Sequence, residues 1–196
     1  MAYSASLEDD KGVLRLAALA RRDALPVEHR SAAAAAIAAR PLPVAAGPHG
    51  LIVSGYLPIR SECDPQPLVR RLIAAGAQLA LPCVAGRGEP LVMRAWRFGD
   101  PVIACRWGLC EPPADAPEVL PDILLVPLAA FDRAGHRVGY GAGYYDMTIT
   151  RLRALKPITA VGIAYAMQEV PRVPASERDA RLDLVLTEHG VIDFRG

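Results

Sequence analysis

Short apolar runs alternate with segments of helical periodicity along most of this chain, and this alternation limits the folds open to it. The spacing predicts strands at residues 51–57, 77–84, 91–98, 122–131, 158–165 and 182–188. Helices are expected at residues 31–40, 67–76 and 144–155, with a first helix ahead of Pro26. The run at 122–131 is continuously apolar, which is typical of a strand buried on both faces of a parallel sheet. We therefore predict one α/β domain over residues 1–196, with an open, mostly parallel sheet flanked by helices.

The overall composition argues against several classes of protein. Apolar residues make up 52% of the 196 residues, charged residues make up 22%, and the net charge is +1. Such a balance offers no general attraction for nucleic acid or for a membrane surface. The apolar runs stay below the roughly 18 residues of a spanning helix, and the cysteines include no C-x-x-C pair. We expect a cytoplasmic protein that acts on small molecules and binds neither nucleic acid nor membranes.

The first helix carries an apolar stripe and a basic stripe. Small and apolar side chains recur at helical spacing, at Val13, Leu16, Ala17, Ala20 and Ala24. We expect this stripe to face the core, and Ser6 with Asp9 resembles a capping box at the start of the helix. Lys11, Arg15 and Arg22 fall within about 40° of one another at 100° per residue. The basic stripe is either a solvated face or a clamp for a polyphosphate.

The stretch RVGYGAGYYD, residues 137–146, joins a predicted strand to a predicted helix. Its G-x-G-x-G spacing matches neither the dinucleotide fingerprint nor the Walker motif. Glycines at a helix N-terminus allow backbone N–H groups to approach an anion closely, so the loop suits a phosphate. The alternative is a tight connection whose tyrosines pack the end of the sheet. Asp146 is either an ordinary first-turn acid or a ligand for Mg²⁺ bridging phosphate oxygens.

These residues resemble the 5-formyltetrahydrofolate cyclo-ligase family, also called methenyltetrahydrofolate synthetase. The densest part is PLAAFDRAGHRVGYGAGYYD, and the segments KGVLR, YLPIRSE, WGLCEP and VGIAYAMQ resemble further family segments in the expected order. Three positions depart from the family pattern. Ala142 stands where glycine is common, Met147 where arginine is common, and Pro65 where threonine is common.

The resemblance implies a fold similar to the sugar-isomerase and CoA-transferase kind, and an ATP- and Mg²⁺-dependent ring closure. ATP would phosphorylate the formyl oxygen of 5-formyltetrahydrofolate, and N10 would then attack the activated carbon. Loss of phosphate would leave 5,10-methenyltetrahydrofolate, ADP and phosphate. Such an enzyme mainly aligns two substrates and neutralises phosphate charge.

The resemblance also implies residue roles on the ATP side. The catalytic set would be Arg137, Tyr145 and Asp146, and Mg²⁺ would bind Asp146 and Asp179, with Asp183 as a reserve. The ATP site would comprise Lys11, Gly12, Val13, Leu14, Arg15, Arg22, Arg137, Val138, Gly139, Tyr140, Gly141, Ala142, Gly143, Tyr144 and Tyr145. For Asp179, a plain surface acid is the alternative.

On the folate side, Glu62 would accept hydrogen bonds from the pterin ring, because a carboxylate suits its amide and amino donors. The implied substrate-binding residues are Tyr56, Leu57, Glu62, Trp107, Tyr140 and Tyr144, and Glu111 would line the same pocket. For any single tyrosine, core packing is the alternative, but three tyrosines near one glycine loop favour a flat ligand.

Two other functions remain open at this point. One is a non-catalytic binder of folate or nucleotide, for which the three departures leave room. The other is a different nucleotide or sugar-phosphate enzyme on the same fold, which would not depend on a reduced folate. We expect a monomer or a weak homodimer.

Overall fold

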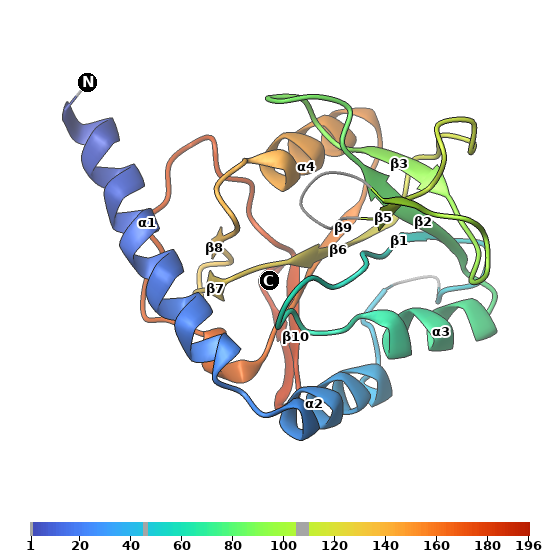
Figure 1. Cartoon of the computed structure of the whole chain (residues 1–196), viewed down its shortest axis with the longest axis horizontal. Coiled ribbons are helices and arrows are strands. Elements are labelled where there is room, and N and C mark those ends of the chain that lie inside the picture. Colours follow the sequence, from blue (N-terminus) through green and yellow to red (C-terminus); the bar gives the residue numbers. More distant parts are fainter. Residues whose placement is uncertain (1, 45–46, 105–109) are drawn as a thin grey trace.

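The protein is built around one seven-stranded sheet (Figure 1). The structure is a computed structural model and describes residues 2–44, 47–104 and 110–196. The strands in spatial order are β11 (Gly190–Asp193), β10 (Leu184–Thr187), β9 (Thr159–Ile163), β6 (Ile123–Pro127), β1 (Ile52–Ser54), β2 (Gln78–Cys83) and β3 (Val92–Ala95). Neighbours from β10 to β2 pair in parallel, and only the two edge strands are antiparallel. The predicted α/β architecture with a mostly parallel sheet is confirmed.

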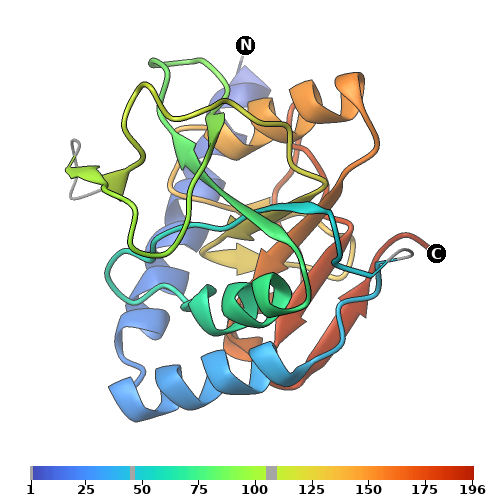
Figure 2. The ribbon, with the colours of Figure 1, turned by 90° about the vertical axis from the view of Figure 1, so that its right-hand side faces the viewer.

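Helices cover both faces of this sheet (Figure 2). α2 (Val27–Ala39) and α3 (Gln66–Ala74) lie on one face, and α4 (Tyr144–Leu155) lies on the other. Successive side chains of a strand point to opposite faces, so Leu125 of β6 packs with the α2 and α3 side while Leu124 packs with the α4 side. Both are fully buried, which explains why the apolar run of β6 is continuous rather than alternating.

α1 (Ala2–Asp23) lies beside the sheet rather than on it (Figure 1). It packs across the short hairpin of β7 (Ala130–Phe131) and β8 (Arg137–Val138) and near η2 (Ala166–Gln168). The prediction of a capping box at Ser6 was wrong, because the helix already begins at Ala2.

The prediction that the apolar stripe of this helix faces the core was also wrong. Val13 and Leu16 are 70% and 71% exposed, whereas Lys11 and Arg22 are buried. The two stripes are about 180° apart on one helix, so turning the cations inward turns the apolar residues outward.

Other differences from the predicted elements are local. β11 was not predicted, and β1 is shorter than its apolar run. The Pro-rich segment after β3 carries a small pair of strands, β4 (Ile103–Ala104) and β5 (Cys110–Glu111). Within the described residues, none of the helices combines the length and apolar character needed to span a bilayer.

The strand order of the sheet reverses between β1 and β6. The chain runs from β1 outward to β2 and β3 and then returns to β6 on the other side of β1. In open α/β sheets, ligands bind where the order reverses, at the carboxyl ends of the strands. The segments that follow β1 and β6 are residues 55–62 and 128–143, which contain Glu62 and the glycine loop.

Candidate active site

The buried guanidinium of Arg22 joins α1 to both of these segments. Arg22 is 1% exposed, and its Nε donates to Ser61 Oγ at 3.0 Å. Its Nη1 donates to the Leu128 carbonyl at 3.3 Å and its Nη2 to the Tyr140 hydroxyl at 2.6 Å. One cation therefore fixes the ends of β1 and β6 and the glycine loop relative to the first helix.

A carboxylate lies on each side of this arginine, reached through a hydroxyl group. The Ser61 hydroxyl donates to Asp23 Oδ1 on one side. On the other side, Glu62 is 8% exposed and accepts the Ile59 N–H at 2.9 Å. Burial raises the pKa of Glu62, although the Ile59 N–H, the charge of Arg22 and the Tyr140 hydroxyl oppose the shift. The site thus holds a carboxyl group that stays protonated to a higher pH than the carboxyl group of an exposed glutamate.

Replacing Ser61 with alanine tests this chain of contacts. We expect Ser61→Ala to lower the free energy of unfolding by about 1–3 kcal/mol, because it leaves Arg22 Nε and Asp23 without their shared partner. Urea unfolding followed by circular dichroism measures the change. Ser54→Ala is the matched control, since Ser54 is also buried but, among the residues that the structure describes, its hydroxyl bonds only to Gly55 O and Met93 Sδ. Equal losses in both variants would contradict a special role for Ser61.

A second buried arginine lies at the entrance to α4. Arg137 is 7% exposed, and its Nη2 donates to Asp146 Oδ1 at 2.9 Å. Its Nη1 donates to the Ala180 carbonyl at 2.6 Å, and the Ala180 N–H donates to the same Asp146 oxygen at 3.0 Å. Burial lowers the pKa of Arg137 and the charge of Asp146 opposes this shift, so the guanidinium stays charged.

Lys11 pairs with Asp179 in the segment before β10. Its Nζ lies 2.6 Å from Oδ1 and 2.7 Å from Oδ2 of Asp179. The N–H and hydroxyl of Ser176 also donate to Oδ2, at 2.6 and 2.9 Å. Partial burial alone would raise the pKa of Asp179, but the hydrogen bonds from Lys11 and Ser176 outweigh it and lower the pKa.

The glycine loop is shaped around Arg15. Arg15 Nε donates to the Gly139 carbonyl at 2.7 Å. Gly141 has a φ of +97°, and a Cβ there would lie 3.3 Å from Arg15 Cζ. Gly143 has a φ of +70° and carries no side chain that could cover the first-turn N–H groups of α4. Two of the three glycines are therefore required by the backbone, and the first turn of α4 suits an anion.

All three residues of the predicted basic stripe contact the candidate site. Lys11 contacts the segment before β10, Arg15 contacts the glycine loop, and Arg22 contacts the segments that follow β1 and β6. The interpretation of the stripe as a solvated face is wrong, because Lys11 and Arg22 are buried. The helix thus brings three cations to the carboxyl edge of the sheet.

The tyrosines do not form one flat wall. Tyr140 is 38% exposed, but Tyr56 is buried in the core and its hydroxyl donates to the Cys63 carbonyl at 2.7 Å. Tyr144 and Tyr145 pack against the core on the α4 side. Burial and the charge of Glu62 raise the pKa of Tyr145, while Arg137 lowers it. Tyr145 thus lies near the charges of both Glu62 and Arg137.

Several of the other predicted residues take a different place. The Val13 side chain points outward, and Trp107 lies outside the described residues. Glu111 accepts the Val84 N–H at 3.1 Å, which holds the Pro-rich segment to the end of β2. Asp183 accepts the Ala160 N–H at 2.7 Å and pairs with Arg153, so it acts at the start of β10.

The remaining predicted positions lie around these contacts. Gly12, Leu14, Leu57 and Val138 are buried or half-buried, and Ala142 is exposed.

The two predicted metal ligands are already engaged by protein groups. Asp146 Oδ1 accepts from Arg137 and Ala180, and both oxygens of Asp179 accept from Lys11. Across the described ranges, no three His, Cys, Asp or Glu side chains gather as they would to hold a metal ion. Asp146 fits a shared ion through its second oxygen, because Mg²⁺ keeps waters and phosphate oxygens beside one or two carboxylates. Asp179 fits only if Lys11 moves away.

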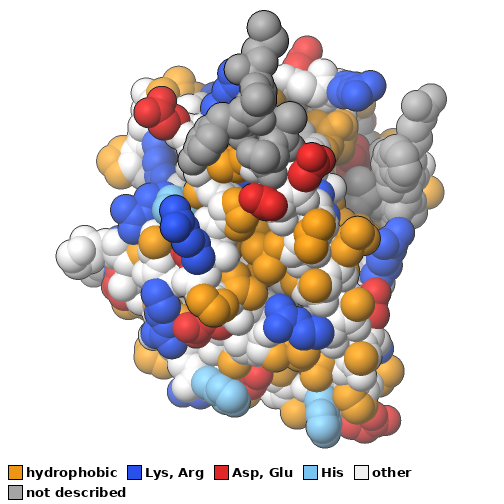
Figure 3. Space-filling view, turned by 90° about the vertical axis from the view of Figure 1, so that its left-hand side faces the viewer, with side chains coloured by type: hydrophobic (Ala, Val, Ile, Leu, Met, Phe, Trp, Pro, Cys, Tyr) orange, Lys and Arg blue, Asp and Glu red, His pale blue; other side chains and the backbone are white. Residues whose placement is uncertain are grey.

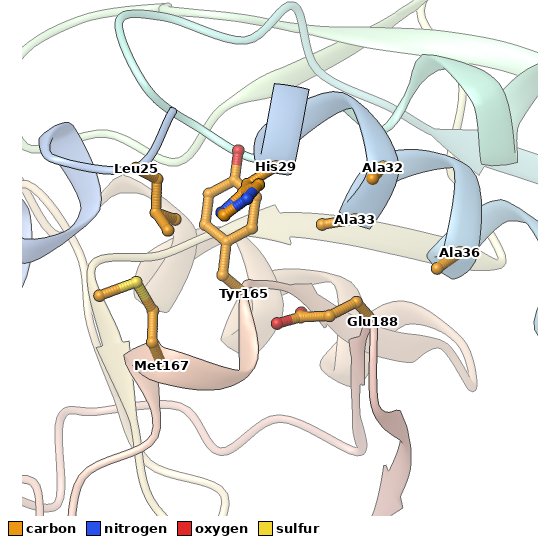
Figure 4. Close-up of a pocket in the computed structure, with 8 residues that line it drawn as sticks. All are labelled: Leu25, His29, Ala32, Ala33, Ala36, Tyr165, Met167 and Glu188. Atoms are coloured by element: carbon orange, nitrogen blue, oxygen red, sulfur yellow. The ribbon is translucent and has the colours of Figure 1, made fainter. Parts of the chain in front are cut away.

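A cavity of about 390 Å³ lies behind the Glu62 segment, between α2 and η2 (Figure 4). Leu25, His29, Ala33, Tyr165, Met167 and Glu188 are among the residues that line it. The Tyr165 hydroxyl donates to the Glu62 carbonyl at 3.3 Å. None of the ionic groups described above lines this cavity, so it is separate from the site.

Asp23 and Ser61 were missed by sequence reasoning. Each is next in sequence to a predicted site residue, Arg22 or Glu62, but adjacency alone does not indicate a hydrogen bond. Only the packing of α1 against the segment that follows β1 brings the two side chains together.

Comparison with known proteins gives one consistent result. The model of a family described as the 5-formyltetrahydrofolate cyclo-ligase family matches residues 7–188. A 5-formyltetrahydrofolate cyclo-ligase of Escherichia coli K12 is 33% identical over 150 residues, which are 72% of this chain and 80% of that protein. The enzyme of the same name from Mycolicibacterium smegmatis is 34% identical over 158 residues, covering 74% of this chain and 78% of the relative.

Solved structures agree with these matches. The Aquifex aeolicus 5,10-methenyltetrahydrofolate synthetase has a TM-score of 0.76 at 29% identity, covering 95% of this chain and 93% of that one. A 5,10-methenyltetrahydrofolate synthetase from Mycoplasma pneumoniae has a TM-score of 0.71, covering 91% and 99%, but at 23% identity it supports the fold alone.

Proposed function

The chain belongs to the 5-formyltetrahydrofolate cyclo-ligase family, and from this premise we propose that it converts 5-formyltetrahydrofolate to 5,10-methenyltetrahydrofolate at the expense of ATP. The observation that carries the proposal is the convergence of Lys11, Arg15 and Arg137 around the glycine loop, close to a buried Glu62. This arrangement offers positive charge for a polyphosphate on one side and an acceptor for a pterin on the other.

In the proposed reaction the formyl oxygen attacks the γ-phosphorus of ATP, and ADP leaves. N10 of the folate then attacks the activated formyl carbon and loses its proton, and the C–O bond to the phosphorylated oxygen breaks. The products are 5,10-methenyltetrahydrofolate, ADP and phosphate. An amide-like oxygen is a poor leaving group until it is phosphorylated, so phosphate transfer makes the ring closure possible.

The residues around the glycine loop would stabilise the charge that develops during phosphate transfer. Arg137 is held rigidly by Asp146 and by the Ala180 carbonyl, so it needs little reorganisation to face the transferred group. The first-turn N–H groups of α4 add a partial positive charge. Lys11 and Arg15 would bind the other phosphates, which requires Lys11 to exchange Asp179 for a phosphate oxygen.

Mg²⁺ bound through Asp146 would neutralise phosphate charge during the transfer. Release of Asp179 by Lys11 would free a second carboxylate at the same place.

Glu62 would hold the pterin. Its carboxylate accepts a single backbone N–H among the described residues and has capacity for the amide and amino donors of the ring. Tyr140 is partly exposed and would contact the ring from the glycine loop. Leu57 belongs to the same segment after β1 as Glu62.

We expect the protein to act in the cytoplasm on these small molecules, without nucleic acid or membrane.

An absorbance assay tests the proposed function. Purified protein with 5-formyltetrahydrofolate, Mg²⁺ and ATP is expected to form the methenyl product, and omission of ATP or addition of excess EDTA is expected to abolish it. Binding of the folate without any product would favour a non-catalytic binder, and turnover of ATP that ignores the folate would favour another nucleotide enzyme.

A further inference from the structure

Asp23 lies at the outer end of the hydrogen bonds that run through Arg22. It is the last residue of α1, the helix on the side of the molecule that Figure 3 shows, and it is exposed. Its Oδ1 accepts the Ser61 hydroxyl, and Ser61 Oγ accepts Arg22 Nε at 3.0 Å. A carboxylate at the surface is thus linked through one hydroxyl group to a buried guanidinium.

The direction of the Ser61 hydroxyl proton decides how well Ser61 can accept from Arg22. A guanidinium only donates hydrogen bonds, so Ser61 Oγ must offer a lone pair to Nε and point its single proton elsewhere. Asp23 accepts this proton. Because a carboxylate only accepts, it holds the hydroxyl in the orientation that suits Arg22. Without an acceptor at position 23 the hydroxyl could rotate, and its bond to the guanidinium would weaken.

The other end of the Arg22 guanidinium repeats this arrangement at Tyr140. Nη2 donates to the Tyr140 hydroxyl at 2.6 Å, and Cζ lies 5.7 Å from the centre of the Tyr140 ring. The Tyr140 hydroxyl interacts in turn with the Glu62 carboxyl group. Because a guanidinium is planar and rigid, the contact of Nε with Ser61 also fixes where Nη2 meets Tyr140. The Asp23 carboxylate is therefore connected to Glu62 through this chain of contacts.

The turn that carries Ser61 and Glu62 adopts an unfavourable backbone conformation. Arg60 has a φ of +54°, and among the residues that the structure describes it is the one residue other than glycine with a positive φ. Residues with a side chain disfavour this region, so the turn would relax if nothing held it. The Glu62 N–H donates to Ile59 O at 3.1 Å, and the Ile59 N–H donates to Glu62 Oε2 at 2.9 Å. The Glu62 carboxylate thus belongs to a strained turn, which Ser61 ties to Asp23.

We propose that Asp23 is a positioning residue for folate binding, because through the Ser61 hydroxyl it holds the turn that presents the Glu62 carboxylate to the pterin. The inference rests on the proposed function, since it adds a residue to the folate side of that site. The glycine loop keeps a separate contact, in which Arg15 Nε donates to the Gly139 carbonyl. Loss of Asp23 should therefore weaken the binding of folate much more than the binding of ATP.

Substitutions at Asp23 test this role. Asp23→Ala is expected to raise both the Kd and the KM for 5-formyltetrahydrofolate by about 10-fold, as the loss of one hydrogen bond does. The KM for ATP should stay within about twofold. Asp23→Asn keeps an oxygen that accepts the Ser61 proton, so its folate affinity should stay within about threefold of the wild type. Calorimetric titration with 5-formyltetrahydrofolate alone measures the Kd, and the absorbance assay measures both KM values.

The matched control is Asp193→Ala. Asp193 is an exposed aspartate on the edge strand β11, where it accepts from Arg195 at 2.9 and 2.6 Å. This variant should bind folate as the wild type does, because its carboxylate belongs to a surface pair away from the candidate site.

Arg60→Gly separates positioning of the turn from a folding defect. Glycine adopts positive φ readily, so the turn should depend less on Asp23 in this background. We expect Arg60→Gly to restore roughly threefold of the folate affinity that Asp23→Ala loses when the two are combined. No loss in Asp23→Ala, an equal loss for folate and ATP, or no recovery in the double variant would overturn the proposal.

The same measurements distinguish this inference from the proposed function. A wild type that binds folate without forming product would overturn the proposed reaction, while the folate Kd of the variants would still decide the role of Asp23. A wild type that binds no 5-formyltetrahydrofolate would overturn both.

Discussion

Arg137→Ala is expected to reduce formation of the methenyl product by about 10²- to 10³-fold, with the loss mainly in kcat. The reason is geometric as well as electrostatic, because Arg137 is buried and held by two partners beside the glycine loop. A charge that is fixed before the reaction stabilises the transferred phosphate without reorganisation. The absorbance assay at saturating folate and ATP measures the change in kcat.

The variant also leaves Asp146 without its cation, so folding must be checked. We expect the free energy of unfolding to fall by about 1–3 kcal/mol, because Asp146 is partly exposed and water replaces part of the lost contact. Added guanidinium ion should restore part of the activity, which a purely structural loss would not allow.

The matched control for Arg137 is Arg153→Ala, which removes a half-exposed arginine from a 2.8 Å ion pair with Asp183 on the outer side of α4. It should leave kcat within about twofold of the wild type, since exposed pairs contribute little. Full activity in the Arg137 variant would remove that residue from the mechanism.

Glu62→Gln is expected to weaken the use of folate while leaving the use of ATP almost unchanged. Loss of a charged acceptor for the pterin donors should lower kcat/KM for 5-formyltetrahydrofolate by about 10- to 100-fold. The KM for ATP should stay within about twofold, because the phosphate contacts come from other residues. Steady-state kinetics with each substrate varied in turn separate the two values. Glu118→Gln is the control, because Glu118 pairs with Arg94 on the exposed side of β3.

The same variant should be more stable than the wild type at neutral pH. The folded-state pKa of Glu62 is raised, mainly by burial, so the folded protein binds this proton more tightly than the unfolded chain. Stability from this group is therefore present at acid pH and is lost as the pH rises through the raised pKa. Glutamine cannot ionise and avoids this loss, so we expect a gain of about 1 kcal/mol, or ~2–4 °C in Tm, at neutral pH.

Folate binding should have the opposite pH dependence. The carboxylate form accepts the pterin donors, so folate affinity of the wild type should fall as the pH drops through the raised pKa of Glu62, and Glu62→Gln should lack this change. Thermal unfolding and folate titration at several pH values measure both trends. A variant that is less stable at neutral pH, with the wild-type pH dependence of binding, would contradict this role for Glu62.

The α/β architecture and the position of the glycine loop could be predicted from the pattern of residues along the chain. The continuous apolar run of β6 requires cover on both faces, and the structure supplies α4 on one face and α2 with α3 on the other. Gly141 and Gly143 adopt positive φ, as glycines in a tight loop before a helix are expected to do. The spacing of Lys11, Arg15 and Arg22 also determined that they share one face, because helical periodicity is a local property of the chain.

The face of α1 that turns inward, and the partners of its cations, could not be predicted in this way and became clear from the packing of the folded protein. Local periodicity gives the helix an apolar stripe and a basic stripe, but it does not indicate which of the two faces the rest of the protein. The choice depends on the surface that α1 covers, where Asp179, Ser61 and the Gly139 and Leu128 carbonyls are spread over distant parts of the sequence. Residues so far apart in sequence come together only in the folded sheet. There, the hydrogen bonds and ion pairs of the cations determine the orientation of α1, and its apolar stripe faces outward.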